Sequence, residues 1–343
     1  MRNINIILAG LCAILSSLHG QESQYHVSGH YPIGGDKSRW DYLYVDPATR
    51  YLYAAHYTKF EVLNADTGVK IGEIAPARRA HGVAIVPEQG RGFASSGSDN
   101  ALIMFDAKTL NTLAIIKTTG TNPDSVRYDA ADTKKIYAVN GSSGNVTVID
   151  PIKGEVVGTV TLTTGKLEQI GFDGRGRAFV NNEEKSEMYV FDTHTLHAIA
   201  TWPLAPGEGG TGLAVDSLHH RVFTTCGNGK LVVLDTDTGK IVATPAIGED
   251  ADGVIFVPAS GLIFTSNSDE TMSILHQDSP DSYRLVQTLK TGVGAKQIAM
   301  DESTGRIFLP AGAFGPKPSP TPQVPEPLPT VVPGSFEIIV VSP

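Results

Sequence analysis

Short apolar runs separated by turn residues recur along the whole chain. In the first unit, apolar segments at 44–45, 51–53 and 60–63 are separated by Asp, Pro, Gly and Asn. Runs this short, rich in Val, Ile, Tyr and Phe, are typical of β-strands, whereas a helix needs a longer segment with 3.6-residue periodicity. No segment carries a helical pattern of three turns. The pattern therefore predicts an all-β protein.

The strand pattern repeats seven times at nearly constant spacing. The first strand of each unit ends in Asp or Pro, and successive ends lie 41 to 44 residues apart. These ends are Asp46, Pro87, Asp129, Asp173, Asp216, Pro258 and Asp301. A second and a third strand follow in every unit, and a fourth strand follows in six of them. A four-stranded unit of this size cannot bury both faces alone, so we expect neighbouring units to stack around an axis.

The seventh unit lacks a fourth strand of its own. Its third strand, at 336–340, is followed only by Val341-Ser342-Pro343. A spare alternating segment at 25–33 precedes the first unit, and we expect it to complete the last blade, because ring closure protects sheet edges. The predicted fold is a seven-bladed β-propeller of four-stranded blades, with the last blade closed by the N-terminal strand.

The first twenty residues have the pattern of an export signal. Arg2 precedes a mostly apolar stretch at 4–18, and Gly20 offers a small residue before the polar start at Gln21. The apolar stretch is short for a membrane span and no stop-transfer segment follows. We therefore expect a signal peptide at 1–20, a single propeller at 21–343, a periplasmic or secreted location, and no membrane span after cleavage. Cys226 would then be the one remaining cysteine.

A proline-rich segment at 315–333 interrupts the seventh unit between its second and third strands. Its prolines are Pro316, Pro318, Pro320, Pro322, Pro325, Pro327, Pro329 and Pro333. Such a segment favours polyproline conformation and cannot pair inside a sheet. We expect a long loop on one face of the ring, which is either a stiff surface excursion or a wall of the central opening.

Net charge argues against one class of partner. The chain carries a formal charge of −9 and has a pI of about 5.6. A net negative charge repels the phosphate backbone of nucleic acids, and binding sites for single-stranded nucleic acid need a cationic groove. Nucleic acid is therefore an unlikely partner.

Two units resemble the repeat of the YVTN β-propeller family. The residues that carry the resemblance are 135–140 with 145–150, and 263–267 with 271–274. The whole chain after residue 20 is similar to the YncE-like exported propellers of bacteria, as are the phrases Arg39-Trp40-Asp41-Tyr42 and Asn122-Pro123-Asp124. The resemblance implies the propeller fold. For function it implies several alternatives. Some YncE-like members are linked with single-stranded DNA binding, and other propellers with similar repeats act as lactonases, quinone-cofactor dehydrogenases or surface-layer proteins. It supplies no catalytic motif.

Polar residues gather where the repeat brings strand ends together. In a propeller, the starts of first strands and the ends of second strands lie on the same face of the ring. Convergent ionisable groups at such an opening are typical of a ligand site, although Asp and Asn also cap strand ends and turns. The candidate ligand-binding residues are Asp41, His56, His81, Asp124, Asn140, Glu168, Asn182, Asp252 and Lys296.

The same residues give a weak indication of a metal site. His56 and His81 come from adjacent units, with Asp41 beside them, and two imidazoles with a carboxylate suit a transition-metal ion. The 25-residue separation of the two histidines follows from the repeat and not from a metal motif. The sequence therefore names no firm metal ligand, no cofactor and no catalytic residue.

Three functional interpretations follow, in this order. The first is an exported binding or scaffold propeller that holds a small molecule, a peptide or a protein partner at the central opening. The second is a lactonase- or oxidoreductase-type enzyme that uses a metal or quinone cofactor there. The third is single-stranded DNA binding, which the acidic balance disfavours.

Overall fold

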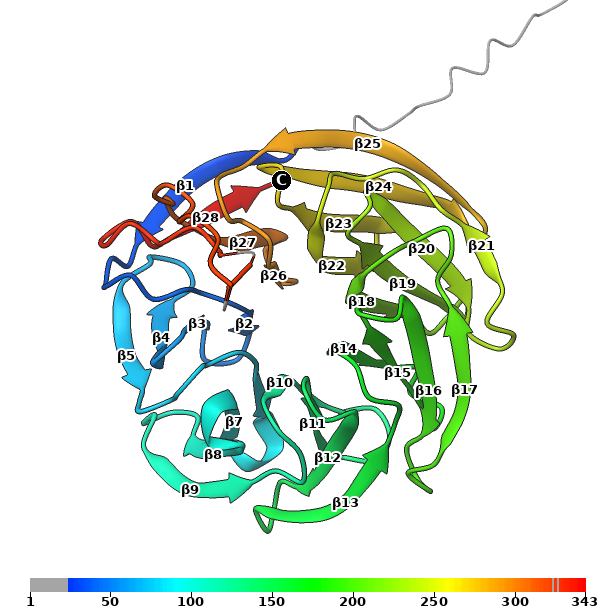
Figure 1. Cartoon of the computed structure of the whole chain (residues 1–343), viewed down its shortest axis with the longest axis horizontal. Helices are drawn as coiled ribbons and strands as arrows, with labels where there is room; N and C mark the ends of the chain where they lie inside the picture. Colours follow the sequence, from blue (N-terminus) through cyan, green and yellow to red (C-terminus); the bar gives the residue numbers. More distant parts are fainter. Residues whose placement is uncertain (1–23, 323, 326) are drawn as a thin grey trace, which may run out of the picture.

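The computed structural model describes residues 24–343 except 323 and 326. Seven four-stranded antiparallel sheets are arranged around a central axis (Figure 1). This confirms the all-β seven-bladed propeller predicted from the repeat. The predicted signal peptide at 1–20 lies outside the described residues.

The strands follow one another in chain order from the axis outward. Blade 1 contains β2 (Leu43–Asp46), β3 (Tyr51–His56), β4 (Lys59–Asn64) and β5 (Lys70–Ile74). Blade 2 contains β6 (Val83–Val86), β7 (Arg91–Ser96), β8 (Ala101–Asp106) and β9 (Thr112–Lys117). Blade 3 contains β10 (Pro123–Tyr128), β11 (Ile136–Asn140), β12 (Asn145–Asp150) and β13 (Glu155–Thr161). Blade 4 contains β14 (Leu167–Phe172), β15 (Arg177–Asn182), β16 (Glu187–Asp192) and β17 (Ala198–Pro203).

The remaining blades keep this order. Blade 5 contains β18 (Gly210–Asp216), β19 (Arg221–Cys226), β20 (Lys230–Asp235) and β21 (Ile241–Ala243). Blade 6 contains β22 (Ala251–Val257), β23 (Leu262–Asn267), β24 (Thr271–Ser279) and β25 (Ser282–Lys290). Blade 7 contains β26 (Ala299–Asp301), β27 (Arg306–Ala311), β28 (Glu337–Ser342) and β1 (His26–Pro32). The helices of the described residues are two 3₁₀ turns, Pro87–Gln89 and Gly97–Asp99, and none is long and apolar enough to cross a membrane.

The N-terminal strand closes the ring, as the sequence predicted. β1 pairs antiparallel with β28 from His26 opposite Ser342 to Pro32 opposite Glu337. Just before β1, the Tyr25 ring packs edge-on against Phe264 of blade 6, with centroids 4.9 Å apart. In Figure 1, β1 occupies the outer rim of blade 7, in line with the outermost strands of the other blades.

One aromatic residue of each second strand forms the repeated core between blades. Tyr53 and Phe93 are fully buried near the middle of β3 and β7. The same position holds Tyr137, Phe179, Phe223, Phe264 and Phe308 in the other blades, and all are fully buried. A large ring at a constant register fills the wedge between adjacent sheets, which explains why the repeat keeps an aromatic residue there.

Aspartates that end the third strands hold the turns that follow them. The carboxylate of Asp106 accepts hydrogen bonds from the backbone N–H of Lys108 at 3.1 Å and of Thr109 at 2.7 Å. Asp192 and Asp235 make the same pair of bonds to the residues two and three positions later. These aspartates hold the hairpins between third and fourth strands and are structural.

Candidate functional site: the mouth of the central channel

One position at or just before the start of each innermost strand surrounds the channel opening. We call this set the mouth ring. It consists of Asp41, His81, Asp124, Glu168, Thr211, Asp252 and Lys296, one residue from each blade. Seven of the candidate residues named from the sequence are ionisable, and all of them except His56 belong to the mouth ring.

Bulges aim several of these side chains. The ladder between β10 and β11 shifts register between Pro123 and Val126, so Asp124 falls inside the irregular segment. The β14–β15 ladder shifts in the same way between Leu167 and Ile170, around Glu168. A bulge leaves a residue outside the ladder and turns its side chain away from the sheet. This local irregularity directs the carboxylates toward the axis.

Asp41, His81 and Asp124 form the tightest group in the mouth ring. One ligand atom from each lies within 4.8 Å of the others. His81 Nδ1 lies in hydrogen-bond contact with Asp41 Oδ2 and 3.8 Å from Asp124 Oδ2. Burial alone would lower the pKa of His81, but the charge of Asp124 and the bond to Asp41 outweigh it and raise the pKa to about 9. His81 is therefore an imidazolium at neutral pH.

The two most buried carboxyls of the ring, Asp124 and Glu168, both have a raised pKa. Burial is the main cause for both, and the pKa of Asp124 rises to about 6 while that of Glu168 rises well above its usual 4.5. Tyr42 lies between them, and its hydroxyl donates to Glu168 Oε2 at 3.4 Å. Burial, with the surrounding carboxylates, also raises the pKa of Tyr42, which stays neutral. Lys166 provides partial compensation, with its Nζ 3.0 Å from Glu168 Oε1.

Asp252 and Lys296 complete the opposite side of the ring. Lys296 Nζ lies 3.1 Å from Asp252 and 3.3 Å from Asp250. Burial raises the pKa of Asp252 to about 6 despite this ion pair. Around the mouth, six carboxyls (Asp41, Asp124, Glu168, Glu183, Asp250 and Asp252) face four basic side chains (Arg39, His81, Lys166 and Lys296). The opening therefore holds more carboxyls than basic groups.

The three candidates at second-strand ends lie in a different environment. His56 is buried with Nδ1 3.6 Å from Glu61, and its ring packs on Phe336 at 4.6 Å. Among the described residues, the group that could hold a metal contains His81 and not His56.

Asn140 and Asn182 are fully buried and bind within their own blades. Asn140 Nδ2 donates to Asn145 and Thr147, each at 2.9 Å, and Asn182 Nδ2 donates to the Tyr189 hydroxyl at 3.1 Å. These contacts are those of strand-end caps, the alternative reading of the sequence.

The proline-rich loop forms part of the opening. Leu328 and Pro329 of this loop, and Phe314 just before it, line a pocket of about 300 Å³. Its lining also includes Arg39, Trp40, Asp41, Asp252, Val293 and Lys296. The segment at 315–333 is thus a wall beside the mouth ring, one of the two roles that the sequence left open.

Residues before the first strand hold this loop in place. The Trp40 ring stacks between Phe314 and Phe336, with centroids 5.4 Å and 5.1 Å away. Arg39 donates a hydrogen bond to the Pro329 carbonyl and lies over the Phe314 ring at 5.3 Å. Arg39, Trp40 and Tyr42 carry part of the family resemblance beside Asp41, but they were not predicted as site residues. Their adjacency to Asp41 was the signal that could have identified them.

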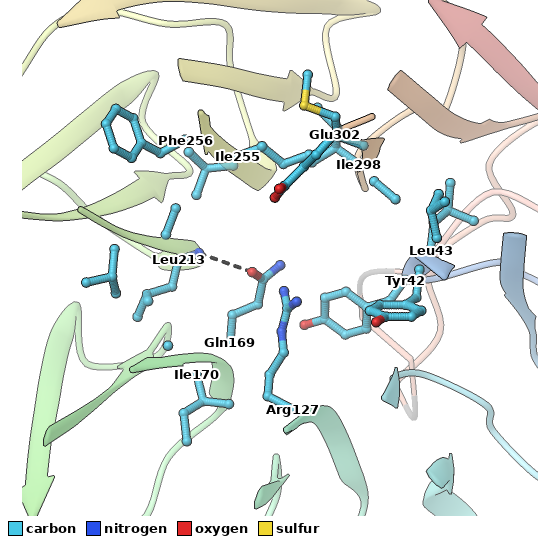
Figure 2. Close-up of a pocket in the computed structure, with 18 of the residues that line it drawn as sticks. Tyr42, Leu43, Arg127, Gln169, Ile170, Leu213, Ile255, Phe256, Ile298 and Glu302 are labelled. Carbon is cyan, nitrogen blue, oxygen red and sulfur yellow. Dashed lines mark hydrogen bonds between the residues drawn. The ribbon is translucent and has the colours of Figure 1, made fainter. Parts of the chain in front are cut away.

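A central cavity of about 540 Å³ lies along the innermost strands. Its lining includes Tyr42, Tyr44, Arg127, Gln169 and Phe256. Figure 2 shows Arg127 and Gln169 pointing into the open centre, near Tyr42. Cys226, by contrast, is buried within blade 5, and burial raises the pKa of its thiol to about 12, as expected for an inert cysteine.

Known structures with the same architecture are distant in sequence. A chain of hydrazine synthase from Kuenenia stuttgartiensis superposes with a TM-score of 0.68 at 14% identity, covering 86% of this chain and 96% of that one. A chain of the mitotic checkpoint complex gives a TM-score of 0.74 at 13% identity, covering 90% and 96%. These similarities show the fold alone.

Sequence comparison gives a more specific relationship. No protein-family model matches the chain. The protein named YncE, described as uncharacterized, from Escherichia coli O157:H7 is 26% identical over 189 residues, which are 52% of this chain and 52% of that protein. YncE of Salmonella typhi is 26% identical over 141 residues, 38% of this chain and 40% of its own. The chain therefore matches about half the length of these relatives or less. Together with the seven blades and the closing N-terminal strand, this similarity fits a YncE-like β-propeller, the family that the repeat indicated.

Proposed function

We propose that this propeller is an exported binding protein that holds an organic cation, an amine with an apolar body, at the mouth of its central channel. The observation that carries the proposal is the excess of carboxyls over basic groups in the mouth ring. Buried carboxylates without full compensation favour a positively charged ligand, because such a ligand returns the raised pKa values toward normal.

The neighbouring pocket suits the apolar part of such a ligand. Trp40, Phe314 and Leu328 supply its apolar wall. Asp41 and Asp252 supply negative charge at its edge, where Lys296 pairs with Asp252 and Arg39 bonds to the Pro329 carbonyl. Ligand sites commonly combine an apolar surface with a few polar groups that fix orientation. An ammonium group at Asp252 would place an attached ring against Trp40.

Titration of phenethylamine tests the proposal, with 2-phenylethanol as the uncharged probe of nearly the same shape. We expect phenethylamine to bind at least tenfold more tightly than 2-phenylethanol. Calorimetry and the fluorescence of Trp40 measure the binding of both probes. Asp252→Asn should weaken the amine at least tenfold. Asp250→Asn is the matched control, because Asp250 pairs with the same lysine but is largely exposed. Equal binding of both probes, or equal effects of the two substitutions, would contradict the proposal.

A second candidate is a divalent transition-metal ion at Asp41, His81 and Asp124. The observation in its favour is that one potential ligand atom from each residue lies within 4.8 Å of the others. Imidazole and carboxylate donors suit such ions. Since His81 Nδ1 faces Asp41 as a proton donor, a metal ion would have to displace that proton.

Titration with Zn²⁺ in buffers of different ionisation enthalpy separates the two candidates. If the metal ion binds at His81, about one proton should be released at pH 7.5. Zinc binding should be lost in the Asp41→Asn variant. Zinc binding without proton release would exclude His81 as a ligand. A bound metal ion is also what the metal-dependent enzyme alternative requires, so the same titration tests that requirement. The proposed periplasmic or secreted location is tested by cell fractionation.

A further inference from the structure

Arg127 occupies an unusual position in the central cavity. It lies on β10, three residues beyond Asp124, which corresponds to about 10 Å along a strand. The equivalent residues of the other blades, which like Arg127 lie opposite the core aromatic residue of the second strand, are uncharged: Tyr44, Ala84, Gly171, Ala214, Ile255 and Ala299. Arg127 is therefore the one charged residue at this strand position, well below the carboxyls of the mouth ring, while Asp301 and Glu302 also line the cavity.

The guanidinium has no counter-ion in the described part of the chain. No hydrogen bond or ion pair of its side chain occurs there, although most other arginines, such as Arg50 and Arg177, are paired with carboxylates. The ionisable groups near enough to affect its pKa are Tyr42 and Tyr44, among the residues described. Burial within the ring lowers that pKa. The side chain is open to the cavity, yet protein surrounds it.

Apart from Glu302 and Asp301, which pairs with Arg50, the rest of the cavity wall offers neutral groups and apolar surface. The Tyr44 hydroxyl has no hydrogen-bond partner in the described ranges and is close enough to Arg127 for their charges to interact. Gln169 is held fixed, because its Oε1 accepts from the Leu213 N–H at 3.1 Å and its Nε2 donates to the Asp252 carbonyl at 3.3 Å (Figure 2). Phe256, Ile255 and Met300 supply apolar surface.

We propose that Arg127 binds the carboxylate of a small organic acid whose apolar body occupies the central cavity. A guanidinium presents two parallel N–H donors that match a carboxylate, and the Tyr44 hydroxyl adds a third donor. A single cation suits a monoanion, whereas phosphate groups are usually held by several cations or a run of backbone N–H groups. The cavity volume of about 540 Å³ accommodates a ligand of this kind.

Benzoate is the probe, and benzamide is its uncharged counterpart of the same shape. We expect calorimetry to show benzoate binding at least tenfold more tightly than benzamide. In the Arg127→Met variant, benzoate affinity should fall at least tenfold, to that of benzamide. Arg127→Lys keeps the charge but loses the paired donors. Its benzoate affinity should lie between that of the unsubstituted protein and that of Arg127→Met. Arg78→Met is the matched control on the surface, where Arg78 pairs with Asp99, and should leave benzoate affinity unchanged.

A direct readout comes from the arginine Nε–Hε signals in nuclear magnetic resonance spectra. Benzoate should shift the signal that disappears in Arg127→Met. Equal binding of benzoate and benzamide, binding of neither, or shifts confined to other arginines would overturn the proposal. The comparison of the two probes needs only the unsubstituted protein, so it stands if a variant fails to fold. Phenethylamine and benzoate carry opposite charges and are titrated separately, so the mouth and the cavity can each fail alone.

Discussion

His81 of blade 2 directs its Nδ1 at the carboxylate of Asp41 in blade 1, so an ion pair joins adjacent blades at the channel mouth. The pKa of His81 is raised from 6.5 to about 9. A histidine with a raised pKa stabilises the folded state fully below the unfolded value, near 6.5, and loses that contribution as pH rises through 9. The contact should therefore make the protein most sensitive to pH in this alkaline window.

The first prediction concerns His81→Gln. We expect the free energy of unfolding of the unsubstituted protein to fall by on the order of 3 kcal/mol between pH 6.5 and 9 through this group. The variant should lack that part of the decline, as measured by urea unfolding at several pH values. His30→Gln is the control, because His30 is an exposed partner of Glu337. Identical pH profiles for the protein and His81→Gln would show that the imidazolium is not stabilised by the mouth.

The second prediction concerns the buried carboxyl of Glu168. Its pKa is raised, chiefly by burial, so the carboxyl favours folding at low pH and opposes it as pH rises above the usual 4.5. Glu168→Gln should therefore stabilise the protein at pH 8 by on the order of 1 kcal/mol and have little effect near pH 4.5. Thermal unfolding at the two pH values measures the difference.

Glu183→Gln is the matched control for this substitution. Glu183 contacts the same Lys166 but is more exposed. We expect no gain at pH 8 from the control. A Glu168→Gln protein that is less stable than the parent at pH 8 would show that its ion pair with Lys166 outweighs the cost of burial.

The third prediction concerns the anchor of the proline-rich loop. Trp40→Ala removes the ring stacked between Phe314 and Phe336 and should cost about 3 kcal/mol of stability. It should also speed proteolytic cleavage within 315–333. Trp202→Ala is the control, since Trp202 packs on Phe179 in blade 4. It should lower stability without exposing the loop to protease, and equal cleavage in both variants would contradict the role given to Trp40.

The propeller could be predicted because each repeat contains the same short-range sequence signals for strands and turns. A turn residue such as Asp46 and an aromatic residue such as Tyr53 recur at fixed offsets, and each does the same work in every blade. The closing strand was predictable by elimination, since six units had four strands and the seventh had three. Fold prediction therefore depended on short-range chemistry repeated along the chain.

The site was less predictable because it depends on side-chain direction. His56 and His81 both come from strand ends on the same rim, yet His56 packs against Phe336 whereas His81 faces Asp41. Bulges such as the one around Asp124 decide these directions, and they have no clear sequence signal. Arg127 was not predicted because the candidate residues were sought only at strand ends, and Arg127 lies within a strand. Its uncharged counterparts in the other repeats were the signal that could have identified it.

The fourth prediction concerns closure by β1. A chain that begins at residue 34 lacks the strand paired with β28 and also lacks Tyr25, whose ring packs against blade 6. Because β28 then becomes an open edge and the ring loses its link across blade 7, we expect a loss comparable with the ~5–15 kcal/mol stability of a typical domain. Circular dichroism and size-exclusion chromatography should show unfolding or aggregation, while a chain that begins at residue 24 stays folded. A peptide of residues 24–33 added to the truncated chain should restore folding. The peptide can pair with β28 through the same backbone hydrogen bonds without being covalently joined to the chain. An unchanged melting temperature in the truncated chain would mean that blade contacts alone close the ring.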